Sequence, residues 1–136
     1  MRERLASARV DGVVWHWPAD EHPRSPRWRV EERVRLLAPF DPIVWDRRRF
    51  ALLWDWTYRF EAYTPAAKRK LGYYALPLLW RNGAIGWVNA QARDGVLAIE
   101  VRYVRTAPAS AVFRRELAEE VERLRMFVGA ERAEIR

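Results

Sequence analysis

Two short runs of cationic residues are the part of the sequence best suited to contact an anion. They are Arg47-Arg48-Arg49 and Lys68-Arg69-Lys70, and Tyr73 follows the second run by three residues. Guanidinium and ammonium groups contact phosphate oxygens, and an exposed aromatic ring stacks on a base. The alternative is that one arginine of each run pairs with Asp46 or Glu61. We predict that nucleic acid binds Arg47, Arg48, Arg49, Lys68, Arg69, Lys70 and Tyr73.

The sequence is poor in groups for other kinds of chemistry. It has no cysteine and only two histidines, His16 and His22. These counts exclude disulfides, thiolate catalysis and cysteine-bound zinc, and they disfavour a histidine-rich metal site. There is also no Ser-His-Asp arrangement and no glycine-rich phosphate loop. We therefore expect no metal and no cofactor.

The composition predicts a folded, basic protein. Half of the 136 residues are hydrophobic, and the formal net charge is +7, which suits one domain with an apolar core. Lysine occurs only at Lys68 and Lys70, so arginine supplies nearly all the positive charge. A basic balance favours nucleic acid or another polyanion. The alternative is a surface that is simply rich in arginine, because 18 acidic residues are interspersed.

The ends and the hydropathy of the chain give no sign of a membrane. The start, MRERL, is charged and lacks the apolar core of a signal peptide. No stretch is apolar enough to span a bilayer. We expect a cytoplasmic protein without a membrane partner.

The first cationic run ends a proline-rich segment, LLAPFDPIVWDRRR, at residues 36–49. Each proline fixes its own backbone and disfavours helical geometry in the residue before it. We predict a rigid, extended elbow that carries large side chains inward. Asp46 is predicted to cap a short helix over residues 47–54, and Asp41 to accept hydrogen bonds from nearby backbone amides.

An antiparallel sheet is predicted after this segment. Alternating residues and turn signals at Asn82-Gly83 and Asp94-Gly95 delimit its strands. The predicted strands are residues 58–63, 73–80, 85–91 and 96–104. A capped helical turn over residues 64–67 separates the first two, and Pro77 predicts an edge or bulged strand. The strands together predict a small barrel or curled sheet.

One long helix is predicted near the end of the chain, over residues 110–128. Its apolar stripe consists of Phe113, Leu117, Val121, Leu124 and Val128. Gly129 suits the position after the helix, and residues 131–136 suit a last short strand. The fold class is therefore α+β: an antiparallel barrel-like sheet with one long C-terminal helix.

The first 27 residues are predicted to be separate from this domain. Residues 2–9 suit a short helix, Asp11-Gly12 a turn and residues 10–17 a strand, which is the order of the last helix and wing of a winged-helix unit. A proline-rich linker follows over residues 18–26, and residues 28–37 alternate like a strand. We assign residues 1–27 to a partial winged-helix remnant with its linker, and residues 28–136 to a C-terminal α+β domain.

Several motifs, in order and at matching spacing, resemble the carboxyl-terminal region of the winged-helix crosslink-repair DNA glycosylases of the AlkZ/YcaQ type. The resemblance covers roughly residues 30–105. The matching residues are Leu36, Leu37, Pro39, Phe40, Asp41, Pro42, Trp45, Asp46 and Arg47; then Tyr58, Glu61, Tyr63, Pro65, Lys68 and Arg69; then Gly72, Tyr73, Tyr74, Leu76 and Pro77. The family usually has Gly-Arg-Val-Asp where this chain has Gly86-Trp87-Val88-Asn89.

The resemblance implies that catalysis is not housed here. In the family, several tandem winged-helix units precede this region, and a Gln-x-Gln or Gln-x-Asp catalytic motif lies far upstream. This chain has one glutamine, Gln91, which shares a predicted strand face with Asn89 on a different element. Asp41 and Asp46 are the obvious carboxylates for cleavage of a glycosidic bond, and we expect both to be structural. We therefore predict no catalytic residue and no activity of this chain alone.

The resemblance and the charge together predict a DNA-binding fragment related to enzymes that unhook or excise alkylated or crosslinked bases. Its partners would be duplex DNA, which includes damaged duplex, and an upstream winged-helix polypeptide. Tyr73, Trp80 and Trp87 are candidates for stacking on bases, although we expect both tryptophans to lie in the core. The alternative function is a non-enzymatic interaction or scaffold domain that does not bind nucleic acid.

Overall fold

The computed structural model describes residues 4–136, and the chain divides into two compact units, Met1–Val30 and Glu31–Arg136. In the first unit, β1 (Leu5–Val10) and β2 (Val13–Pro18) form an antiparallel hairpin, which a 3-10 helix, η1 (Pro26–Trp28), follows. The predicted turn at Asp11-Gly12 is confirmed, because both residues have the positive φ that such a turn requires. The helix predicted over residues 2–9 is wrong from residue 5 onward, because those residues pair with β2, and residues 2 and 3 lie outside the described residues.

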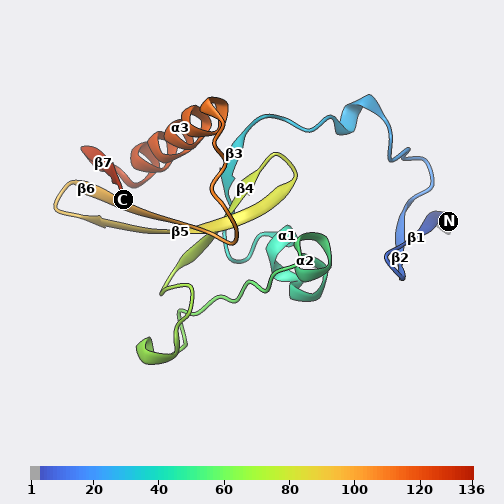
Figure 1. Cartoon of the computed structure of the whole chain (residues 1–136), viewed down its shortest axis with the longest axis horizontal. Helices are drawn as coiled ribbons and strands as arrows, with labels where there is room; N and C mark the ends of the chain where they lie inside the picture. Colours follow the sequence, from blue (N-terminus) through green and yellow to red (C-terminus); the bar gives the residue numbers. More distant parts are fainter. Residues whose placement is uncertain (1–3) are drawn as a thin grey trace. The chain divides into compact units, whose positions relative to one another are not determined.

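The second unit is built on a curled five-stranded sheet (Figure 1). Its order is β3 (Val34–Leu36), β4 (Ala75–Trp80), β5 (Gly83–Arg93), β6 (Val96–Tyr103) and β7 (Arg132–Ile135). β4, β5 and β6 run antiparallel, as predicted, and β3, which was not predicted in this sheet, pairs antiparallel with β4. β7 pairs parallel to β6. The predicted α+β class with a curled sheet and one long helix is confirmed.

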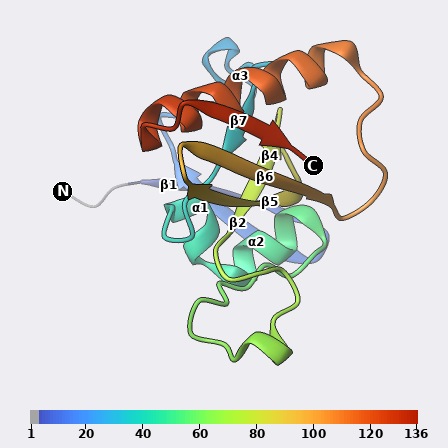
Figure 2. The same ribbon diagram turned by 90° about the vertical axis from the view of Figure 1, so that its left-hand side faces the viewer.

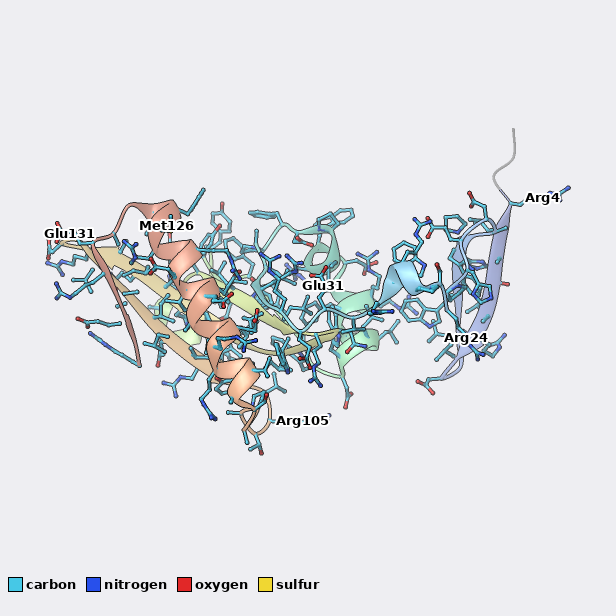
Figure 3. All side chains as sticks on the ribbon, turned by 90° about the horizontal axis from the view of Figure 1, so that it is seen from above. Arg4, Arg24, Glu31, Arg105, Met126 and Glu131 are labelled. Atoms are coloured by element: carbon cyan, nitrogen blue, oxygen red, sulfur yellow. The ribbon has the colours of Figure 1, made fainter. Side chains whose placement is uncertain are left out.

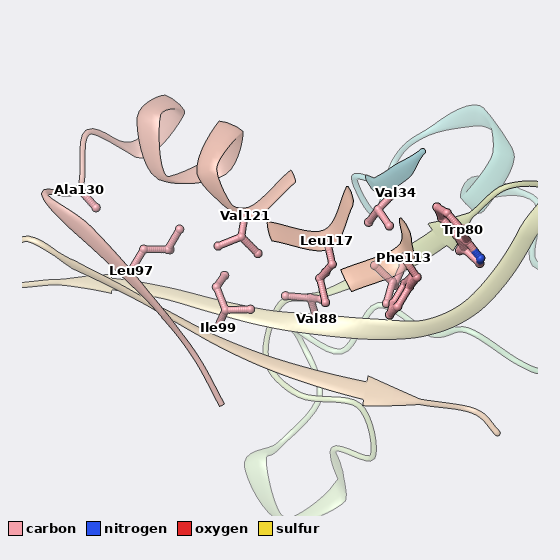
Figure 4. Packing of buried hydrophobic residues seen from close by; sticks show 10 residues of the cluster. Val34, Trp80, Val88, Leu97, Ile99, Phe113, Leu117, Val121 and Ala130 are labelled. Carbon is pink, nitrogen blue, oxygen red and sulfur yellow. The ribbon is translucent and has the colours of Figure 1, made fainter. Parts of the chain in front are cut away.

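The long helix α3 (Ala111–Val128) covers one side of this sheet, and Figure 3 shows it crossing the sheet between the labelled Arg105 and Met126. Ser110 caps its start by accepting the N–H of Phe113, and Gly129 ends it at φ 72°. Phe113, Leu117 and Val121 of the predicted stripe are buried, whereas Val128 is exposed. Figure 4 shows the core that they form with side chains of the sheet, which are Val34, Leu78, Trp80, Val88, Leu97 and Ile99.

The other side of the sheet carries α1 (Pro42–Trp45), α2 (Arg47–Trp54) and the segment that leads from α2 to β4, which includes a 3-10 helix, η2 (Ala66–Lys68). Figures 1 and 2 both show these elements on the side opposite α3. A second buried cluster fixes them there, and its members are Leu37, Val44, Phe50, Tyr58, Ala75 and Ala84. The sheet therefore separates two layers, α3 on one face and α1, α2 and residues 57–74 on the other.

The predicted elbow is correct in position but wrong in detail. Pro42 begins a helical turn instead of extended chain, because proline suits the first position of a helix and Asp41 caps it by accepting the N–H of Ile43 at 2.8 Å. The buried members of the segment are Leu37, Pro39 and Val44. Phe40 and Trp45, its two largest side chains, are 69% and 75% exposed.

Two of the predicted strands are absent or much shorter. Residues 58–63 have no strand partner and form irregular chain, because β3 occupies the place beside β4. Residues 28–37 contribute only the three residues of β3. A register shift between Leu78 and Leu79 makes β4 bulged as predicted, but β4 lies inside the sheet instead of at its edge.

The two sheet hairpins differ in how well the sequence predicted them. Asp94-Gly95 turns with φ 49° and 75°, as predicted. The turn after β4 is displaced by one residue, because Trp80 pairs with Gly83 and the turn therefore consists of Arg81 and Asn82. No helix within residues 4–136 is both long and apolar enough to cross a bilayer.

Candidate nucleic-acid interface

The first cationic triplet forms the first turn of α2. Asp46 caps this helix by accepting the N–H of Arg49 at 3.0 Å, as predicted. Arg47 and Arg48 are exposed, and Arg49 is half-buried and donates to the carbonyl oxygen of Pro42. Positive side chains oppose the helix dipole at a helix start, and each costs about 0.3–1 kcal/mol there. Helix stability therefore does not explain why three arginines stand at this position.

The second triplet lies in a loop that Glu61 organises. The Glu61 carboxylate is buried, and its Oε2 atom accepts the N–H of Lys70 and Leu71 at 2.8 Å and that of Gly72 at 3.3 Å. Burial by itself would raise the pKa of Glu61, but these donors and the charge of Arg59 outweigh it and hold the pKa below its ordinary value of 4.5. Glu61 therefore binds backbone amides and not a cationic side chain.

The side chains of the second triplet are consequently left for other contacts. Lys68 and Lys70 are exposed. Arg69 donates from Nε to the carbonyl oxygen of Thr64 at 2.7 Å, and its guanidinium carbon lies 4.9 Å from the ring centre of Tyr73. Tyr73 is 60% exposed. The loop thus presents two ammonium groups and one tyrosine ring that carries a guanidinium on one face.

Aromatic contacts join the loop to the segment that precedes α1. The ring of Phe60 lies edge-on to Phe40, Tyr63 and Tyr74, at centroid distances of 5.4, 6.1 and 5.2 Å. Tyr58, which is buried, donates its hydroxyl to the carbonyl oxygen of Ala75 at 2.8 Å. Burial, with a smaller contribution from Tyr74, raises the pKa of the Tyr58 hydroxyl. The elements that carry the two triplets are thereby packed together on one side of the sheet.

The acidic residues near the triplets do not neutralise them through ion pairs. Residues 37–74 contain seven cationic and four acidic side chains. Asp41, Asp46 and Glu61 accept backbone N–H groups, and Asp55 pairs with Arg105, which lies outside this segment. Within the described part of the chain, none of the seven cations has a carboxylate within 4.0 Å. The alternative, in which one arginine of each run pairs with Asp46 or Glu61, is therefore wrong.

The tryptophans that were candidates for base stacking belong to the core, as expected. Trp80 is buried against Phe113, at a centroid distance of 5.4 Å. Trp87 is partly buried, stacks obliquely on Trp56 and donates its indole N–H to the carbonyl oxygen of Leu71 at 2.9 Å. The side-chain amide of Asn89 donates to the same carbonyl at 2.8 Å. These contacts fix the loop to β5.

A groove of about 1080 Å³ lies where this loop meets the open face of the sheet. Residues 69–74 form one wall, β5 and β6 form the floor, and Arg136 lies on the far side. Sequence reasoning missed this groove and three of its polar residues, Gln91, Arg102 and Arg136. The alternation in β5 and β6 carried part of the signal, since it places Gln91 and Asn89 on one face.

Comparison with known protein families decides the relationship of the chain. A family model described as DNA glycosylase AlkZ-like matches residues 1–127. The chain belongs to the AlkZ-like family of DNA glycosylases. This assignment confirms the resemblance seen in the sequence. No solved structure matches the chain.

Several residues that match the AlkZ-like family motifs have structural roles in the loop before β4. In the Tyr-x-x-Glu-x-Tyr motif, Tyr58 and Glu61 are buried and bind backbone groups of the following loop, whereas Tyr63 is 92% exposed. Gly72 has φ 128°, and a Cβ atom there would lie 2.2 Å from Oδ1 of Asn89. These residues therefore shape the loop that presents the second triplet.

Proposed function

We propose that residues 31–136 bind the phosphate backbone of duplex DNA through the two cationic triplets, as the binding region of an AlkZ-like DNA glycosylase. The observation that carries this proposal is the set of seven cations without ion pairs in residues 37–74, on elements that share one side of the sheet. Lysine and arginine side chains that are free of carboxylate partners can neutralise DNA phosphates. The counterions condensed on the DNA are then released, and this release drives binding. We take the polyanion to be DNA because the chain belongs to a family of DNA glycosylases.

The roles within this interface follow from the geometry. Arg47 and Arg48 at the start of α2, with Lys68 and Lys70 in the loop, contact phosphates. The N-terminal backbone N–H groups of a helix also attract an anion. Tyr73 stacks on an exposed base through the ring face that Arg69 leaves free. We place no bond-cleaving residue in this set, because Asp41 and Asp46 are helix caps.

The hairpin unit is assigned by proposal only. We infer that residues 1–27 are the wing of a winged-helix unit with its linker, and that residues 28–136 form the C-terminal domain. The β1–β2 hairpin supports a wing, whereas the helix expected before it is a strand. The damaged duplex that we propose as a binding partner carries an alkylated or crosslinked base, in keeping with the resemblance of residues 30–105.

The test compares two triple variants that lose the same charge. The first replaces Arg47, Arg48 and Lys68 by alanine, and the second replaces Arg93, Arg115 and Arg132. The control arginines each lie within 4.0 Å of a carboxylate and are 63–81% exposed in their side chains. Fluorescence anisotropy with a labelled 20-base-pair duplex over a salt series measures the affinity of each.

We expect the first variant to bind roughly tenfold more weakly and its salt slope to fall by about 2.7, since each phosphate contact contributes about 0.9. The control variant should stay within about twofold of the parent. Equal losses in both variants would show that only net charge matters. Salt-insensitive self-association without DNA affinity would instead support the scaffold alternative.

A further inference from the structure

The sheet face opposite α3 is open to solvent beyond the second buried cluster, and it forms the floor of the groove. Three cross-strand pairs of β5 and β6 line this floor. They are Trp87 with Arg102, Asn89 with Glu100, and Gln91 with Ala98. One solvated face is ordinary in an antiparallel sheet. Here, however, a wall closes one side of the face, and the floor combines an aromatic ring, two amides and a cation.

The wall is held in place by contacts with the floor. Trp87 and Asn89 both donate to the carbonyl oxygen of Leu71, and Gly72 lies so close to Asn89 that a side chain would not fit. Glu61 holds the same stretch of backbone from the other side. The groove therefore exists before any ligand binds, and a ligand need not order its wall.

The charge of the groove favours an anion. Four cationic residues line it, and they are Arg69, Lys70, Arg102 and Arg136, against one carboxylate, Glu100. Glu100 pairs with Arg102, and Arg136 lies 3.7 Å from Glu134, which does not line the groove. Among the described residues, Arg69 and Lys70 are the lining cations without a carboxylate within 4.0 Å, and the charged residues of the lining sum to +3. Tyr73 and Tyr74, at 60% and 45% exposure, give aromatic surface at the rim.

Gln91 is the polar group in the groove that is best placed for a ligand. It is exposed, and no hydrogen bond within residues 4–136 engages its side-chain amide. The residue opposite it across the strands is Ala98, whose methyl group leaves room beside the amide. An amide that both donates and accepts can meet the hydrogen-bonding edge of an unpaired base.

We propose that this groove binds a short stretch of single-stranded DNA, and this proposal rests on the proposed function of the neighbouring triplets. Cations that track a backbone beside aromatic stacking surface are the usual equipment of single-strand binding. Base pairs in a duplex hide their ring faces and Watson–Crick edges, and we assign Gln91 to the Watson–Crick edge, so the groove suits unpaired nucleotides. Lys70 and Arg136 contact phosphates, Tyr73 stacks on a base, and Gln91 bonds to a base edge. Lys70 and Tyr73, which line the groove, belong to both proposed sites.

The test places one negative charge in the groove and one outside it. Gln91→Glu puts a carboxylate on the floor, and Asn82→Asp makes the same change in the exposed turn after β4, which does not line the groove. Both positions are exposed, so neither change should disturb folding, and a thermal melt checks this. Each variant is titrated into a fluorescein-labelled ten-residue oligothymidylate and into the 20-base-pair duplex.

We expect Gln91→Glu to weaken binding of the oligothymidylate roughly fivefold or more, through repulsion of phosphate and loss of the amide donor. The duplex affinity should change by less than about twofold, and Asn82→Asp should leave both affinities within that range. Equal weakening by both variants, or no effect of Gln91→Glu, would overturn the groove proposal.

The two proposals can fail separately in this experiment. If the parent protein binds the duplex but not the oligothymidylate, the groove proposal is wrong and the duplex interface stands. If it binds the oligothymidylate in a manner that Gln91→Glu weakens but does not bind the duplex, the groove stands and the proposed function is wrong. If it binds neither probe, both are wrong.

Discussion

The two sides of the sheet in residues 31–136 use arginine in opposite ways. On the α3 side, the helix contains four arginines and four glutamates. Arg123 pairs with Glu120 at 2.8 Å and Arg125 with Glu122 at 2.6 Å, both one helical turn apart. On the other side, the seven cations of residues 37–74 have no such partner among the described residues.

The difference has a geometric cause. Along a helix, residues three or four apart are neighbours, so a sequence of alternating signs pairs with itself. On the side of residues 37–74, Asp41 and Asp46 accept backbone N–H groups at the starts of two helices. Glu61 accepts backbone N–H groups of the loop that follows η2. These three acidic side chains therefore bind backbone amides and not the cationic side chains near them.

This contrast shows that the count of basic residues in a chain does not locate a polyanion site. The site is located instead by the region in which the acidic side chains bind other groups and leave the cations unpaired. The following predictions test that contrast, and they are ordered by the size of the expected effect.

Replacing Glu61 by alanine should disrupt the loop side and leave the α3 side folded. Three backbone N–H groups lose their acceptor, and we expect unfolding to become easier by about 3 kcal/mol. Urea denaturation measures this change. Glu134→Ala, which removes a carboxylate from an exposed pair, should change stability by less than about 0.5 kcal/mol. Similar losses in both variants would contradict the role of Glu61.

Acid should weaken the loop side in the same manner but by less. The pKa of Glu61 is lower in the folded chain than its ordinary value of 4.5, so the ionised carboxylate stabilises the fold above about pH 4.5. This contribution is lost as the pH falls through the depressed pKa. Glu61→Gln should lack this part of the pH dependence. Parallel stability curves for parent and Glu61→Gln between pH 7 and pH 3 would contradict the prediction.

Releasing the arginines of α3 should create weak DNA binding there. In the variant that lacks Arg47, Arg48 and Lys68, we replace Glu116, Glu119 and Glu122 by glutamine. Among the described residues, these changes remove every carboxylate within 4.0 Å of Arg115 and Arg125, whereas Arg123 keeps Glu120. We expect duplex affinity to rise about threefold at low salt. Circular dichroism checks that α3 remains helical. An unchanged affinity would show that ion pairing is not what silences this face.

Reversing one charge at the start of α2 should separate stability from binding. Arg48→Glu puts a negative charge where the helix dipole favours it, so we expect the free energy of unfolding to rise by about 0.5 kcal/mol while duplex binding weakens. Arg48→Gln should give an intermediate result for both quantities. Loss of stability in Arg48→Glu would mean that the arginine has a structural contact after all.

Local signals in the sequence were sufficient wherever neighbouring residues settle the conformation. Asp46 caps the helix that it was predicted to cap, since a cap needs only the next two or three N–H groups. Asp94-Gly95 turns as predicted because both residues tolerate positive φ. The apolar stripe of α3 follows from the helical period alone.

Contacts between distant residues decided the rest. Alternation over residues 58–63 resembles a strand, but a strand needs a partner. One edge of β4 pairs with β5, and Val34–Leu36 pairs with the other. Residues 5–9 were predicted as part of a helix, but they belong to the strand Leu5–Val10. They form a strand because pairing with Val13–Pro18 outweighs a weak local preference for helix. The parallel pairing of β7 likewise depends on where α3 returns the chain.

The candidate site shows the same division. The sequence by itself determined which residues are cationic and aromatic, which helix starts they lie near, and the family to which the chain belongs. Only the tertiary structure decided that Glu61 binds the amides of residues 70–72 instead of an arginine, and that Gln91, Arg102 and Arg136 line one groove with Tyr73. The physical reason is that an acid's partner is chosen by competition among groups brought together by folding, and spacing along the chain does not record that competition.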